Sequence, residues 1–114
     1  MGVRIVRQSA SLEDIDGMLE ELGDYIKLAV DVERGILAGG GEYHADCEEV
    51  LLNDGSEQQN IWGADWYPGS REILFGALIN IRPNQGNLGM EITNQNLRNK
   101  IKEIVLTLLN TKDI

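Results

Sequence analysis

The stretch that decides the fold is YIKLAVDVERGIL, residues 25–37. Its first eight residues alternate between apolar side chains and a mixed set, which is typical of a β-strand with one buried face. Gly35 can take a positive φ angle, so residues 33–35 predict a hairpin turn that returns Ile36 and Leu37 beside the strand. The first prediction is therefore an antiparallel pair of strands.

Further strands are predicted on both sides of this pair. Residues 60–67 and 72–82 are separated by PGSR, residues 68–71, whose composition favours a turn. They predict a second antiparallel hairpin. The almost continuous apolar run in residues 72–82 predicts a strand in the middle of the sheet, covered on part of both faces. Residues 3–7 and 88–92 predict two short strands.

Three segments have the apolar spacing of helices. Ser11 and Asp14 open the first, which Gly23 is expected to stop, and a shorter helix starts near His44. Thr93 or Asn94 caps the last one, whose apolar stripe lies opposite Arg98, Lys100 and Lys102. The order of elements lacks the regular alternation of a doubly wound sheet. The sequence predicts one α+β domain over residues 1–114, in two layers: a mainly antiparallel or mixed sheet of about five strands, with two to three helices packed on one face.

The composition excludes several classes of function. Ten Lys and Arg face 19 Asp and Glu, which gives a formal net charge of −9. Such an acidic chain would repel a nucleic acid, so we expect no nucleic-acid partner. No apolar stretch approaches membrane-spanning length, so we expect no membrane partner. The single cysteine, Cys47, cannot form an internal disulfide, and a cytoplasmic location is the expectation.

The densest group of chemically capable residues is GGGEYHADCEE, residues 39–49, which holds the single histidine and the single cysteine. A glycine loop that runs into a helix start can bind an anion, but the acidic residues here oppose one and favour a cation or an amine. Imidazole, thiolate and carboxylate together suit zinc or another divalent metal. The metal-ligand candidates are His44, Asp46, Cys47 and Glu48.

The same segment also has a purely structural interpretation. A glycine run often marks a tight loop, and acidic residues in a first turn stabilise a helix. Cys47 would then be a small core residue, and His44 would form a local hydrogen bond. A Cys47 nucleophile with His44 as base is a further alternative, which nearby carboxylates oppose because they raise the pKa of a thiol.

Other polar residues extend the candidate site. The carboxylates of Asp31 and Glu33 on the predicted hairpin could meet the glycine loop and bind a metal ion, or they could simply face solvent. The loop after residue 82 is rich in hydrogen-bonding groups, which could hold a ligand or bond to the backbone of the loop itself. Trp62 and Trp66 share a strand face and could form a stacking platform, a subunit contact or part of the core. The ligand-binding candidates are Glu33, Arg34, Gly40, Gly41, Glu42, Arg82 and Asn84.

Residues 30–52, VDVERGILAGGGEYHADCEEVLL, together with INIRP at residues 79–83, resemble a family of small bacterial and archaeal proteins of unknown function. The resemblance implies a free-standing protein of about this length and no particular activity. From the residues we expect a small binding or interaction protein that contacts a small cationic ligand or a basic partner. An edge strand could also pair across a twofold axis and give a homodimer. The alternative is a metal-dependent enzyme, or a small-ligand site, built on residues 39–48.

Overall fold

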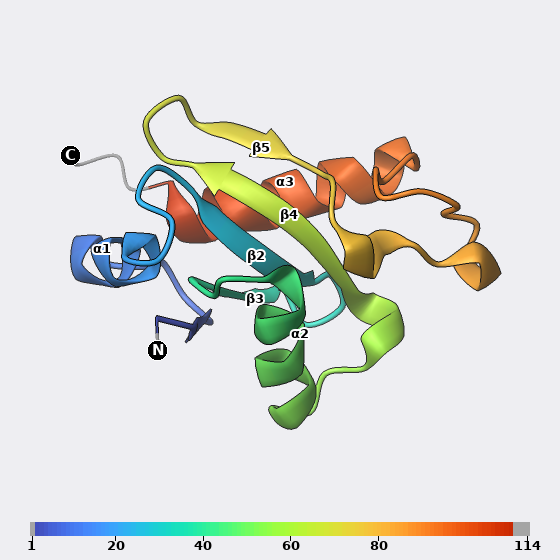
Figure 1. Cartoon of the computed structure of the whole chain (residues 1–114), viewed down its shortest axis with the longest axis horizontal. Helices are drawn as coiled ribbons and strands as arrows, with labels where there is room; N and C mark the ends of the chain where they lie inside the picture. Colours follow the sequence, from blue (N-terminus) through green and yellow to red (C-terminus); the bar gives the residue numbers. More distant parts are fainter. Residues whose placement is uncertain (1, 111–114) are drawn as a thin grey trace.

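The structure, a computed structural model, describes residues 2–110. Its strands are β1 (Arg4–Val6), β2 (Ile26–Asp31), β3 (Ile36–Gly39), β4 (Ile61–Tyr67) and β5 (Glu72–Leu74). Its α-helices are α1 (Leu12–Leu19), α2 (His44–Asn53) and α3 (Gln95–Leu109). Short 3-10 helices follow one another in the second half: η1 (Gln58–Asn60), η2 (Leu78–Asn80) and η3 (Pro83–Gln85). Figure 1 shows their arrangement.

All five strands belong to one antiparallel sheet in the order β1-β3-β2-β4-β5. The strand predicted first, β2, lies at its centre and pairs with β3 on one side and β4 on the other. Gly35 takes a φ of +68° in the turn between β2 and β3, as predicted. The predicted hairpins of β2 with β3 and of β4 with β5 are both confirmed.

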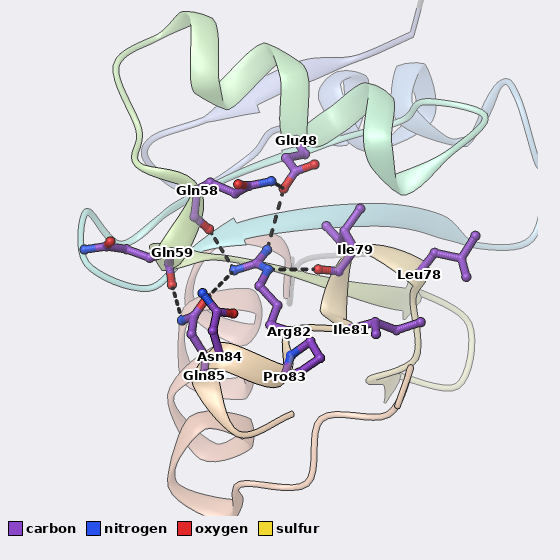
Figure 2. A pocket seen from close by; sticks show the side chains of 10 residues that line it. All are labelled: Glu48, Gln58, Gln59, Leu78, Ile79, Ile81, Arg82, Pro83, Asn84 and Gln85. Carbon is purple, nitrogen blue, oxygen red and sulfur yellow. Dashed lines mark hydrogen bonds and ion pairs between the residues drawn. The ribbon is translucent and has the colours of Figure 1, made fainter. Parts of the chain in front are cut away.

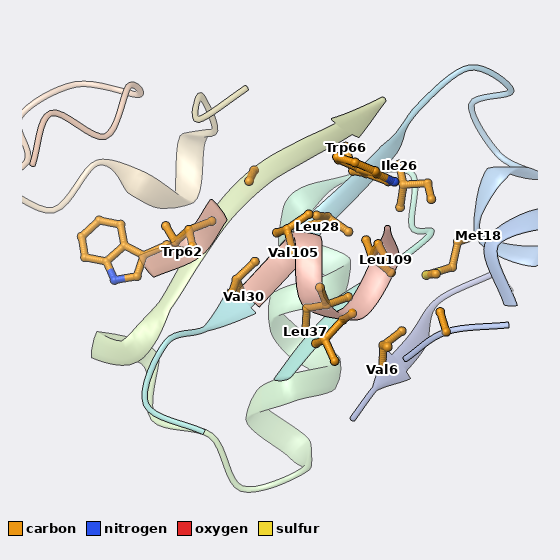
Figure 3. Close-up of a cluster of buried hydrophobic side chains, with 14 of the residues drawn as sticks. Val6, Met18, Ile26, Leu28, Val30, Leu37, Trp62, Trp66, Val105 and Leu109 are labelled. Carbon is orange, nitrogen blue, oxygen red and sulfur yellow. The ribbon is translucent and has the colours of Figure 1, made fainter. Parts of the chain in front are cut away.

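Helices cover both faces of the sheet. On one face, α1 and α3 pack over Leu28, Val30 and Trp66 in a core that also contains the predicted α3 stripe (Figure 3). On the other face, α2 packs Cys47 and Leu51 against a smaller apolar cluster. The α+β class with five strands and three helices is confirmed. The helices do not share one face, because β2 and β3 are apolar on both faces through Ala29, Ile36 and Ala38.

The helix ends follow the predicted capping chemistry. The Ser11 side chain accepts from the backbone N–H of Asp14, and the Asp14 carboxylate accepts in return from Ser11. Asn94 caps α3 by accepting from the N–H of Leu97. Helix α1 ends at Leu19, and the N–H of Gly23 donates to the Leu19 carbonyl. In the described part of the chain, no helix combines the length and apolarity needed to cross a membrane.

The prediction of a central strand over residues 72–82 is wrong. Strand β5 ends at Leu74 and lies at the edge of the sheet. The predicted strand over residues 88–92 is also wrong, because this segment forms only one isolated bridge, between Glu91 and Gly76. Apolar residues after Leu74 belong to the turns around η2 instead of a strand.

The Asn80 side chain takes the place of the missing strand. Its Oδ1 accepts from the Gly63 N–H at 2.8 Å, and its Nδ2 donates to the Gly63 carbonyl at 3.0 Å. A primary amide can pair with a backbone amide in this way because it carries the same donor and acceptor. Nδ2 also contacts the carbonyls of Phe75 and Met90, at 3.2 and 3.3 Å. One buried side chain therefore fastens residues 75–90 to β4.

Replacing Asn80 with alanine is expected to lower the free energy of unfolding by about 2–4 kcal/mol, because the buried amide groups of Gly63 lose their partner. Urea unfolding followed by tryptophan fluorescence measures this change. Asn84→Ala is the matched control, since Asn84 is exposed; it should change stability by less than about 0.5 kcal/mol. Equal stabilities for the two variants would contradict the assigned role of Asn80.

Candidate functional site

Two neighbouring cavities lie on the α2 side of the sheet, between α2 and the segment that Asn80 holds in place. The cavities share Leu78 and Ile79 of η2 as lining residues. His44 lines one cavity and Glu48 lines the other; they are four residues apart on α2 and face η2 together. We call the two the Arg82 cavity and the His44 cavity.

The Arg82 cavity has a volume of about 500 Å³ and a polar lining (Figure 2). It is lined by Glu48, Gln58, Gln59, Leu78, Ile79, Ile81, Arg82, Pro83, Asn84 and Gln85. Two predicted ligand-binding residues, Arg82 and Asn84, are therefore in it, together with one predicted metal ligand, Glu48.

The guanidinium of Arg82 is already saturated by the protein. It donates to the backbone carbonyls of Ile79 at 3.1 Å, Gln58 at 2.8 Å and Ile61. It also lies 4.7 Å from the centre of the Trp62 ring and 3.6 Å from a Glu48 oxygen. Burial lowers the pKa of Arg82, and the Glu48 carboxylate partly opposes that effect. These contacts make Arg82 a support for β4 and η1 more than a free anion-binding group.

The His44 cavity is smaller, about 340 Å³, and its lining is mainly apolar. It is lined by Lys27, Tyr43, His44, Ala45, Gly76, Ala77, Leu78, Ile79 and Met90. Three of these side chains form an exposed rim: Leu78 is 72% exposed, Tyr43 60% and Met90 47%. A soluble chain seldom leaves several large apolar side chains in water around one hollow without a binding function.

One lining residue of the His44 cavity, His44 itself, forms a histidine–carboxylate pair with Asp65. His44 Nε2 lies 2.8 Å from Asp65 Oδ1, and both side chains are largely buried. Asp65 is on β4 and directly opposite Lys27 on β2. The Lys27 ammonium donates to the Glu42 carbonyl at 3.0 Å and lies 5.5 Å from the centre of the Tyr43 ring. The cavity thus joins a mainly apolar lining to two polar side chains held in fixed positions, His44 and Lys27.

The hairpin residues Glu33 and Arg34 lie away from both cavities. The Asp31 carboxylate accepts from their backbone N–H groups and so shapes the turn. The Arg34 guanidinium donates to Ser56 Oγ and to Asp54, both at 2.7–2.8 Å. Arg7 reaches the same Asp54 carboxylate, and the two arginines hold its pKa at about 2. Neither Glu33 nor Arg34 lines the Arg82 cavity or the His44 cavity.

The glycine loop has a packing role. Gly40 has a φ of +102°, and a Cβ there would collide with the Gly2 carbonyl and lie 3.0 Å from the Met18 Cα. The loop therefore lets the start of the chain and α1 approach the end of β3. Gly40, Gly41 and Glu42 line a hollow of about 170 Å³ with Glu21 and Asp46. This hollow is separate from the two cavities on either side of η2.

The four predicted metal ligands are directed to different partners. His44 pairs with Asp65, and Asp46 accepts from the Tyr43 N–H. The Cys47 thiol donates to the Lys27 carbonyl, while Glu48 faces Arg82 and Gln58. Within residues 2–110, no three His, Cys, Asp or Glu side chains meet in a group that could hold a metal ion. The geometry therefore gives the predicted metal set no support.

Several residues in the His44 cavity or next to it were not predicted from the sequence. Asp65 lies in an alternating strand with no motif around it, and its meeting with His44 depends on how α2 crosses the sheet. Leu78 and Met90 belong to segments predicted as strands, so their exposure was hidden. The sequence leaves undecided whether Trp62 and Trp66 lie at the surface or in the core. In the structure both side chains are buried. Only the neighbourhood of His44 carried a usable signal.

The chain belongs to a family described as protein of unknown function (DUF5674), whose model matches residues 4–108. This confirms the resemblance to a family of unknown function. No curated protein and no solved structure matches the chain. The family carries no activity or ligand with it, so function has to be argued from the cavities themselves.

Cys47 is expected to resist alkylation in the folded protein. Its side chain is fully buried, and burial raises the pKa of its thiol to about 11. At pH 8 only about one thiol in a thousand would be ionised. Mass spectrometry after iodoacetamide treatment at pH 8 should find the folded chain unmodified and the urea-unfolded chain fully modified. Rapid modification of the folded chain would return Cys47 to the candidate nucleophiles.

Proposed function

We propose that this chain is a small interaction protein that binds a basic polypeptide segment, with one apolar side chain of that segment seated in the His44 cavity. The observation that carries the proposal is the exposed rim of Tyr43, Leu78 and Met90 around a mainly apolar hollow of about 340 Å³. A hollow of this size can accept a side chain such as Leu, Met or Phe. Burying such a side chain contributes about 1.5–3 kcal/mol.

Charge supports a basic partner over a second copy of the chain. Each copy carries a formal net charge of −9, so two copies would repel one another. Near the cavity, the one lysine that lines it, Lys27, lies directly opposite the carboxylate of Asp65, so the two together add no net positive charge there. A basic segment would therefore meet an attractive field, which raises association rates and favours the correct partner.

The His44–Asp65 pair favours a second candidate, an enzyme that uses the same cavity. A carboxylate that orients an imidazole is what a general base requires, and His44 could then activate a water molecule. The residues lining this cavity include no serine, threonine or cysteine that could serve as a nucleophile. This candidate ranks second because the cavity beside the pair is mainly apolar. Among its lining residues, only Lys27 could stabilise a negative charge that develops during a reaction.

A panel of fluorescein-labelled nonapeptides tests the proposed function. In the sequence GRRRxRRRG, x is Leu, Met, Phe or Ser, and fluorescence anisotropy gives the Kd. The apolar peptides are expected to bind about tenfold more tightly than the serine peptide, because about 1.4 kcal/mol corresponds to a factor of ten. Leu78→Ser should remove this preference. Leu88→Ser is the matched control, since Leu88 is 77% exposed and lines neither cavity.

Two results would count against the proposal. Equal Kd values for the apolar and serine peptides would mean that the His44 cavity takes no side chain from a polypeptide. A dimer found by light scattering, and lost in Leu78→Ser but kept in Leu88→Ser, would make a second copy the occupant of the rim.

A further inference from the structure

Beyond the His44 cavity, no helix formed by residues 2–110 lies over part of the α2-side face of the sheet. Helix α2 packs on β2, β3 and β4, while α1 and α3 lie on the opposite face. Figure 1 shows the end of β4 and all of β5 in front of α3 with nothing covering them. Leu74 of β5 pairs with Asp65 in the sheet, which places both on this face, and Leu74 is exposed. The open face continues directly from the cavity.

Two tyrosines stack on each other on this open face, and we call this pair the tyrosine platform. The rings of Tyr25 and Tyr67 stack with their centres 4.9 Å apart and their planes within 8° of parallel. Each is half-buried, so the stack keeps contact with solvent. The outer face of each stacked, electron-rich ring attracts a cation that lies over it, and arginine does this most often.

Carboxylates surround the platform. Glu72 is paired with Tyr67 in the sheet, Asp65 is two residues before Tyr67 on the same face, and Asp24 precedes Tyr25. Burial has the largest effect on the pKa of Tyr67 and raises it, and the charges of Asp65, Glu72 and Asp24 raise it further. Within residues 2–110, neither Asp24 nor Glu72 forms an ion pair. Asp24 and Glu72 therefore place negative charge beside the tyrosine rings that no ion pair within residues 2–110 offsets, and this charge matches a positively charged side chain of a partner.

We propose that the Tyr25–Tyr67 platform is a subsite for an arginine side chain of the partner polypeptide. The guanidinium would stack on the tyrosine rings and face the carboxylates of Glu72 and Asp24. This inference rests on the proposed function, because it assigns a second contact to the same partner.

The spacing of the two contacts predicts the partner's sequence pattern. Asp65 contacts His44, a lining residue of the cavity, and Tyr67 lies two residues further along β4, which corresponds to about 7 Å. An extended peptide places side chains of one face at the same interval. The arginine is therefore two residues from the apolar side chain.

A citrulline scan tests the subsite. Each arginine of GRRRLRRRG is replaced in turn by citrulline, which keeps the shape of the side chain and removes its charge. One replacement, two residues from the leucine, should weaken binding roughly two- to fivefold more than the others. Tyr67→Leu should remove that difference, and Tyr67→Phe should keep it because the ring remains.

Glu72→Gln and Glu13→Gln separate the subsite from general attraction by charge. Both variants lower the negative charge by one, but Glu13 is an exposed residue in the first turn of α1. Glu72→Gln should weaken binding of the arginine peptide more than Glu13→Gln does. Equal effects, together with a citrulline penalty that is the same at every position, would overturn the subsite.

The same scan with serine in place of the central leucine distinguishes the two failures. A position-specific citrulline penalty that depends on Tyr67 in the serine peptide would show the arginine subsite alone, even where the apolar preference is absent. Loss of the penalty with an intact leucine preference would overturn the subsite and leave the proposed function standing.

Discussion

The amide of Asn80 is the contact on which the second half of the molecule depends. It pairs with both backbone groups of Gly63, as the next strand of the sheet would, although β5 ends at Leu74. A buried backbone N–H or carbonyl without a partner costs about 1–3 kcal/mol, so β4 needs this substitute at the position where β5 has left the sheet. The pairing also frees residues 75–90 from strand geometry, which lets them turn outward and build the walls of both cavities.

Two further polar side chains complete this framework. Arg82 caps the carbonyl of Ile61, two residues before Gly63 on β4. Asn87 donates to the carbonyls of Asn80 and Glu91 and accepts from the N–H of Thr93. Each is buried and each bonds mainly to backbone groups. Side-chain hydrogen bonds therefore fix the irregular segment, as backbone hydrogen bonds fix a strand in a sheet. They also hold the rim residues Leu78 and Met90 in exposed positions.

The sequence predicts the regular part of the fold because its signals are local. Alternation identified β2, helical spacing and Asn94 identified α3, and Gly35 identified the turn between β2 and β3. The run after Glu72 gave a wrong strand because apolar residues there serve turns and a cavity wall, and periodicity cannot tell these uses apart. Nothing local marks Asn80 as a substitute strand, since its role exists only once Gly63 is beside it.

The candidate site, like the fold, was predictable from the sequence only where the signal is local. His44 could be selected from the sequence because the chain has a single histidine in a group of acidic residues, but its partner Asp65 is 21 residues away and joins it only in three dimensions. Glu33, Arg34 and Gly40 were selected for their chemistry and have turn, ion-pair and packing roles. Residue type identifies chemical capacity, while burial and the direction of each side chain decide whether that capacity is available.

The edges of the sheet bear on which surface a partner can use. Both edge strands, β1 and β5, are three residues long, and a short edge offers few backbone groups to an added strand. Beyond β5, the outer groups of β4 at Gly63 and Ile61 are already bonded to Asn80 and Arg82. The side chains that replace a strand therefore also close the edge against strand addition, and what remains open is the face with the His44 cavity and the tyrosine platform. A partner that docks on this chain would contact that face through its side chains, which is why an apolar residue and an arginine at strand spacing form the pattern that fits it.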